Sequence, residues 1–112
     1  VEYTQSTPPT ANDDPLVNRL RATWKTSLGD DFVHAFSPDH MGAEDFPQFT
    51  TEPYIPSVYW QVGGTSLTDL QMEEKGELTI ASHHSPLFKV SPESVKMGTE
   101  STIHALLELM KK

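Results

Sequence analysis

The chain has 112 residues, enough for one domain with a modest core, and its sixteen acidic and eight basic side chains give a formal net charge of −8. This balance, with no basic cluster beyond Lys111 and Lys112, argues against nucleic acid and membrane surfaces as partners. The absence of cysteine excludes disulfides and thiolate zinc sites, and no apolar run approaches the roughly 20 residues that cross a bilayer.

The first features in chain order are a connector and a helix. Residues 6–14 are rich in Pro, Thr, Asn and Asp, which is typical of a connector, and we expect a boundary there. Asp14 followed by Pro15 has the pattern of a helix N-cap with proline at the first helical position. An amphipathic helix that stops at Gly29 is therefore predicted. Its apolar positions are Val17, Leu20, Trp24 and Leu28.

Three short runs are predicted to be strands. Residues 32–36 ("FVHAF") and 57–63 ("SVYWQVG") are rich in strand-favouring side chains, and the second run is apolar enough for burial on both faces. Residues 78–80 predict a brief strand that leads to a pair of histidines. Because strands buried on both faces belong to sheets that helices cover, we expect an α/β fold with a short sheet packed with helices.

Two segments between these runs are predicted differently. The acidic residues of the stretch 41–49 suit the positive end of a helix dipole, so a short helix is expected to open at Gly42. Residues 65–75 are polar and are interpreted as an excursion at the surface.

The end of the chain predicts a second long helix. Ser91 followed by Pro92 repeats the cap pattern, and an apolar stripe continues to the end of the chain. Gly98 lies inside this helix at a cost of about 1 kcal/mol relative to Ala, which indicates close approach to a neighbouring element.

Two constellations could carry chemistry. In residues 42–45 ("GAED"), glycine would let the backbone approach a ligand while a carboxylate orients a metal ligand or a substrate amide. Helix capping by the two acids is the alternative. In residues 83–86 ("HHSP"), proline rigidifies the turn, which suits a metal-ligating imidazole. The alternative there is a loop histidine with a backbone partner.

Taken in order, the segments "PPTANDD", "MGAEDFPQF", "VYWQVGG", "HHSPLFKV" and "SVKMGTE" resemble the C-terminal third of the metal-dependent amidohydrolases related to hippurate hydrolase. That family includes N-acyl-amino-acid amidohydrolases and plant auxin-conjugate hydrolases. The resemblance implies the C-terminal portion of a zinc-exopeptidase-like catalytic domain. Residues 1–11 would be the last strand of the lid (dimerisation) domain and the return crossing, and residues 12–112 the C-terminal part of the catalytic domain.

The resemblance also implies site residues. The last metal ligand of the family is the His two residues before the Pro in a His-Ser/Thr/Asn-Pro-x-Phe/Tyr motif, which here is His84 and not its neighbour. Gly42, Glu44 and Asp45 match the family's Gly-Ser-Glu-Asp-Phe segment, with Ala43 in place of Ser, and are expected to line the substrate pocket. The other metal ligands and the glutamate general base come from earlier motifs, which this chain does not contain.

The implied activity is metal-assisted hydrolysis of the amide bond of N-acyl amino acids or related small amides and peptides, with zinc or manganese as the metal. With a single ligand, the chain alone is expected to be inactive. Its expected partners are the amide substrate, the missing N-terminal part of the catalytic domain and further copies of itself, because a divided sheet exposes strand edges. The alternatives are a non-catalytic binding module on the same scaffold and a parent that lost its upstream ligands. Cytoplasm is the default localisation, and periplasm stays open.

Overall fold

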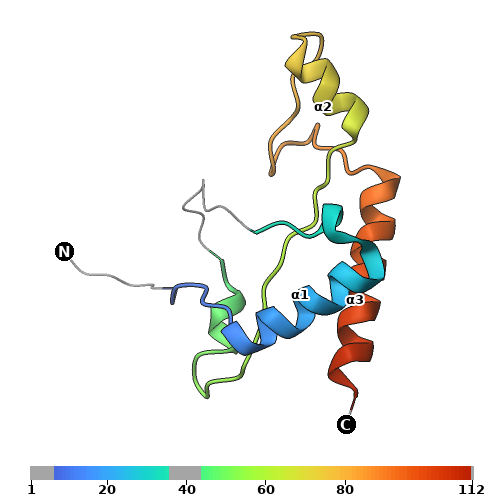
Figure 1. Ribbon diagram of the computed structural model, residues 1–112. Helices are drawn as coiled ribbons and strands as arrows, with labels where there is room; N and C mark the ends of the chain where they lie inside the picture. The colour runs from blue at the N-terminus through green and yellow to red at the C-terminus, as the bar shows by residue number, and fades with distance from the viewer. Residues whose placement is uncertain (1–6, 36–43, 112) are drawn as a thin grey trace, which may run out of the picture. The chain divides into compact units, whose positions relative to one another are not determined.

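The computed structural model describes residues 7–35 and 44–111 (Figure 1). Its elements in chain order are α1 (Asp14–Leu28), the 3-10 helices η1 (Asp30–Phe32) and η2 (Phe46–Phe49), α2 (Leu67–Glu74) and α3 (Pro92–Leu109). No strand forms within the two described ranges. The prediction of an α/β fold with a short sheet is therefore wrong, and self-association through strand edges loses its basis.

The predicted strands are irregular, and in the longest of them backbone groups bond to partners other than a strand. Residues 57–63 contain the strongest strand signal, yet the N–H and C=O of Tyr59 bond to the side chain of Asn12. The carbonyl of Ser57 accepts a hydrogen bond from the backbone N–H of Asp13. Strand propensity describes a fit to a pleated, paired surface, and no strand among the described residues supplies that surface. Residues 33–35 and 78–80 are likewise irregular, and residue 36 lies outside the described part.

The chain divides into two compact units, which are considered separately. The first contains the described residues up to Trp60 together with residues 108–111, and the second contains residues 61–107. The predicted lid segment lies partly outside the described residues, so the division between residues 11 and 12 stays a prediction.

The start of α1 lies one residue from the predicted cap. Asp13, and not Asp14, is the N-cap, because its Oδ1 accepts a hydrogen bond from the N–H of Leu16 at 3.0 Å. Pro15 lies in the first turn, where backbone N–H groups have no acceptor within the helix, so the missing N–H of proline costs no hydrogen bond. The predicted combination of acidic cap and proline is confirmed with this shift in register.

The end and the buried face of α1 follow the sequence pattern. Gly29 ends the helix with φ of 103°, a conformation that side chains with a Cβ rarely adopt, and its N–H bonds to the carbonyl of Lys25. Leu20 and Trp24, four residues apart on one face, are both buried. The ring of Trp24 packs against that of Trp60 with 5.3 Å between centroids. Leu20 and Trp24, together with the buried Pro47 of η2, form the core of the first unit. The partly exposed Trp60 covers Trp24.

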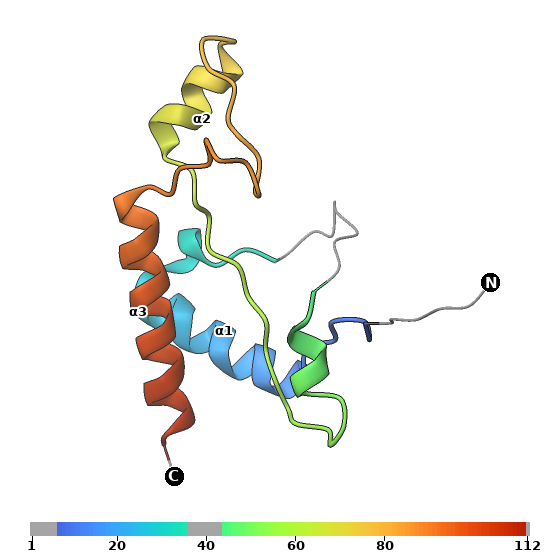
Figure 2. The ribbon, with the colours of Figure 1, turned by 180° about the vertical axis from the view of Figure 1, so that it is seen from behind.

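The second unit contains a helix that the sequence reading missed. Residues 65–75 were expected to be a surface excursion, but α2 occupies most of them, and Ser66 caps it by accepting the N–H of Asp69 at 3.1 Å. The helix is nevertheless largely solvent-exposed, with Leu67 78% exposed. An irregular return segment follows it (Figures 1 and 2).

The last predicted helix is confirmed as α3. Ser91 Oγ accepts the N–H of Ser94 at 3.2 Å, so the serine acts as the predicted cap. A Cβ on Gly98 would meet Val62 Cγ2 at 3.9 Å, which is ordinary van der Waals contact. The expected neighbour therefore exists, but it does not approach closely enough to require glycine.

No helix in the described part of the chain combines the length and the apolar character needed to cross a membrane.

Candidate functional site

The predicted metal ligand His84 lies in a tight turn of the second unit. The backbone N–H of Ser85 donates to the carbonyl of Ser82 at 3.2 Å, and the N–H of Phe88 donates to the carbonyl of Ser85 at 3.0 Å. The hydroxyl of Ser85 also accepts the N–H of Leu87 at 3.2 Å. Two consecutive turns thus hold the backbone around the histidine.

The two neighbouring histidines have different environments. The ring of His83 packs against that of Phe88, with 4.9 Å between centroids and a tilt of 53°. His84 is exposed and has φ of 66°, a left-handed conformation that costs a non-glycine residue on the order of 1 kcal/mol. No hydrogen bond or ion pair joins its imidazole to the rest of the described chain. The nitrogens of His84 are therefore available to an external ligand.

Among the described residues, the surroundings of His84 provide one metal ligand, its own imidazole. An exposed neutral imidazole is a suitable donor for zinc or manganese. Within residues 7–35 and 44–111, however, no group of three or more His, Asp or Glu side chains is arranged to hold a metal ion. A metal at this histidine would need further ligands from outside the described residues.

Glu44 lies in the first unit, directly before η2, and its carboxylate is fully engaged. Its Oε1 accepts the N–H groups of Asp45 at 2.9 Å and of Phe46 at 3.2 Å, and its Oε2 accepts the hydroxyl of Tyr59 at 2.9 Å. The bond from Tyr59, followed by that from Phe46, lowers the pKa of Glu44 below its usual value. The carboxylate thus binds the backbone where η2 begins.

The other predicted pocket residues are in different situations. Asp45 is exposed, and its carboxylate has no hydrogen-bond partner among the described residues. Gly42 lies outside the described part of the chain. The helix expected to open there begins instead at Phe46, as the short 3-10 helix η2. Glu44 and Asp45 are thus brought together in the first unit, whereas His84 belongs to the second.

Sequence reasoning missed the residue that holds Tyr59. The side-chain amide of Asn12 accepts the backbone N–H of Tyr59 at 2.7 Å through Oδ1 and donates to its carbonyl at 2.9 Å through Nδ2. The Tyr59 ring packs against Phe46, with 5.5 Å between centroids. The sequence offers no local signal for this contact, because the two partners lie 47 positions apart.

The next residue of the connector adds two further contacts to the same segment. Asp13 donates its backbone N–H to the carbonyl of Ser57 at 3.0 Å and accepts the hydroxyl of Tyr54 at 2.7 Å through Oδ2. This hydrogen bond is the main cause of a raised pKa for Tyr54. The connector, which the sequence marked only as a boundary, therefore binds the segment 54–59.

Comparison of the chain with protein-family models, with curated proteins and with solved structures finds no match. The resemblance to the amidohydrolases consequently stays a prediction that rests on the sequence motifs.

Proposed function

We propose that the chain is the C-terminal part of a metal-dependent amidohydrolase that hydrolyses N-acyl amino acids or related small amides, and that His84 supplies one metal ligand. The proposal rests on the backbone conformation and the exposure of this histidine. The backbone is left-handed and held by turns on both sides, and the exposed imidazole that it carries has no hydrogen bond to residues 7–35 or 44–111. Unfavourable backbone conformations cluster at sites where the direction of a side chain matters.

The contrast between the neighbours supports the choice of His84. His83 is engaged with the ring of Phe88, and turning it toward a metal would give up that contact. His84 would lose no interaction with the described chain on binding a metal. The turn also restricts its backbone beforehand, so little conformational entropy remains to be lost.

The proposed roles of the other residues follow from their contacts. When bound, the metal would polarise the amide carbonyl and lower the pKa of the attacking water. Glu44 would stay bound to the start of η2, because its carboxylate is already occupied by three donors. Asp45, with an exposed and uncommitted carboxylate, could accept a hydrogen bond from the substrate amide. The remaining ligands and the general base would come from the upstream part of the enzyme. The cytoplasm is the default localisation of the protein.

The test uses the full-length protein that contains this chain, with zinc or manganese added. His84→Ala is compared with the matched variant His83→Ala, which removes the neighbouring imidazole. Metal content and the hydrolysis of a panel of N-acetyl and N-benzoyl amino acids are measured, with circular dichroism as the control for folding. We expect His84→Ala to lose bound metal and to lower hydrolysis by orders of magnitude, while His83→Ala keeps both.

Two outcomes would contradict the proposal. If His84→Ala keeps the metal content and activity of His83→Ala, the histidine is not a ligand. If the folded wild-type protein binds neither metal and hydrolyses none of the panel, the non-catalytic binding module becomes the better interpretation.

A further inference from the structure

We propose that Asn12 is a positioning residue for Glu44, acting through the backbone and the hydroxyl of Tyr59. The inference connects three segments of the first unit that are far apart in sequence. Its geometric part stands independently, whereas its meaning for substrate binding rests on the proposed function.

The side chain of Asn12 contacts the main chain of Tyr59. The carboxamide supplies one acceptor and one donor, and the two bonds of 2.7 and 2.9 Å satisfy both backbone groups of a single residue. One side chain thereby makes the two hydrogen bonds that a neighbouring strand would make with this residue. A pair of bonds from one planar group restricts the rotation of Tyr59 more than a single bond would.

The side chain of Tyr59 in turn contacts η2 and Glu44. The ring packs against Phe46, the first residue of η2, and the hydroxyl donates to Glu44 Oε2 at 2.9 Å. The position of the hydroxyl depends on where the Tyr59 backbone is held. Loss of the Asn12 contact should therefore weaken the bond to Glu44.

The carboxylate of Glu44 also binds the backbone that carries Asp45, which is predicted to contact the substrate. The other oxygen of Glu44 accepts the N–H groups of Asp45 and Phe46, so the carboxylate couples Tyr59 to the backbone that carries Asp45. Side chains that orient a substrate need such support, since a loosely held group binds with the wrong geometry. Asn12 would thus act on the substrate without touching it.

The test compares Asn12→Ala and Tyr59→Phe with Asn18→Ala in the full-length protein. Asn18 is an exposed residue of α1 whose side chain has no hydrogen-bond partner among the described residues, so it controls for the same chemical change. Tyr59→Phe removes only the hydroxyl and retains the ring. Folding of each variant is checked by circular dichroism.

Two readouts do not depend on hydrolysis. Hydrogen exchange at the Tyr59 amide should become roughly two- to tenfold faster in Asn12→Ala, as expected for the loss of one backbone hydrogen bond. The Glu44 carboxyl, followed by NMR titration, should show a higher pKa in Asn12→Ala and in Tyr59→Phe than in wild type. Asn18→Ala should leave both quantities unchanged.

The third readout addresses the substrate. Asn12→Ala and Tyr59→Phe should raise KM for N-acyl amino acids several-fold at unchanged metal content, because the ligand His84 is intact. Unchanged exchange and titration in Asn12→Ala would overturn the inference, whatever the activity. A wild-type protein without hydrolysis would remove the proposed function, while the exchange and titration data would still decide whether Asn12 positions Glu44.

Discussion

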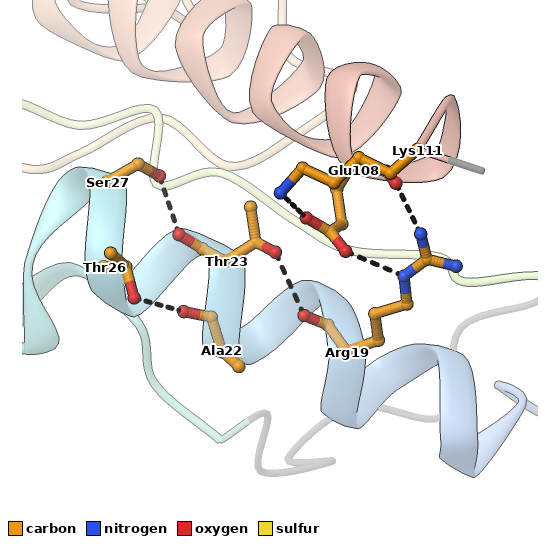
Figure 3. A network of polar contacts seen from close by, with 7 residues as sticks. All are labelled: Arg19, Ala22, Thr23, Thr26, Ser27, Glu108 and Lys111. Carbon is orange, nitrogen blue, oxygen red and sulfur yellow. Dashed lines mark hydrogen bonds and ion pairs between the residues drawn. The ribbon is translucent and has the colours of Figure 1, made fainter.

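Arg19 in α1 and Glu108 near the end of α3 form an ion pair, with 2.9 Å between Nε and Oε1 (Figure 3). The guanidinium also donates to the backbone carbonyl of Glu108, and Lys111 binds its other carboxylate oxygen. The bonds from Lys111 and Arg19 lower the pKa of Glu108 to about 2. The carboxylate therefore remains charged in the folded state at pH values where an unfolded chain would protonate it.

The first prediction concerns acid stability. Because the folded pKa of about 2 lies below the ordinary value of 4.5, the charged Glu108 stabilises the fold above that value, and this contribution is lost as the pH falls toward 2. Glu108→Gln should therefore have a lower Tm than wild type at pH 7, and the difference should shrink as the pH is lowered. Thermal unfolding followed by circular dichroism measures both effects.

Glu100→Gln is the control for this experiment. Glu100 faces Lys96 at 3.9 Å in an exposed i,i+4 pair of α3, an arrangement that contributes little. Its Tm should follow that of wild type at every pH. A Glu108→Gln profile that also runs parallel to wild type over the acid range would contradict the prediction.

The second prediction concerns the core of the first unit. Leu20 is 2% exposed, so Leu20→Ala should lower the free energy of unfolding by about 2–5 kcal/mol through lost contacts and the cavity left behind. Leu67→Ala makes the same change in α2 at a position that is 78% exposed, and it should cost no more than about 0.5 kcal/mol. Urea unfolding of both variants gives the comparison. Equal midpoints would show that Leu20 is not buried in solution.

The long helices could be predicted because their signals are local. A capping side chain, a proline in the first turn and apolar residues at helical spacing all lie within the segments that became α1 and α3. α2 has the cap Ser66, but its eight residues include few apolar positions, so its pattern did not stand out. The predicted strands failed for the opposite reason, since pairing depends on a partner elsewhere in the chain.

In the candidate site, too, the local contacts could be predicted from the sequence and the long-range contacts could not. The bonds from Glu44 to the next two N–H groups are local, and the capping interpretation of the acidic pair anticipated that kind of contact. The bonds that join Tyr59 to Glu44 and Asn12 connect residues 15 and 47 positions apart. No periodicity or motif within a short window reports such pairs. The left-handed backbone of the exposed His84 could not be predicted either, because Pro86 restricts the residue directly before it, Ser85, and not the histidine.

The third prediction uses the two glycines at and within helices. Gly98→Ala should raise the free energy of unfolding by about 1 kcal/mol, because alanine favours the helix and its Cβ would only reach ordinary contact with Val62. Gly29→Ala should instead destabilise the protein, since φ of 103° is unfavourable for a residue with a Cβ. Urea unfolding of the two variants should give shifts of opposite sign. If Gly98→Ala is destabilised, Val62 Cγ2 lies closer to the new Cβ in solution than the 3.9 Å found here.

The fourth prediction concerns the hydroxyl that Tyr54 donates to Asp13. The hydrogen bond and the negative charge of Asp13 raise the pKa of Tyr54, so the folded chain retains this proton at pH values where the unfolded chain loses it. The resulting stabilisation is present below the ordinary tyrosine pKa of 10.0 and is lost as the pH rises through the folded value. Asp13→Asn should lower the pKa of Tyr54, because the neutral amide interacts less strongly with the hydroxyl and no longer opposes its ionisation.

Asparagine is chosen at position 13 because it changes the charge and retains the helix cap. Asn caps a helix about as well as Asp, so α1 should still begin after residue 13 while the charge of Asp13 is removed and that of Asp14 remains. The titration is followed by ultraviolet absorbance of tyrosinate, with Tyr54→Phe identifying the contribution of that ring. Asp31→Asn, which removes an exposed acid of η1, should leave the curve unchanged. If Asp13→Asn also titrates like wild type, the connector does not hold Tyr54 in solution. The connector would then bind segment 54–59 through the Asn12 side chain and the backbone N–H of Asp13.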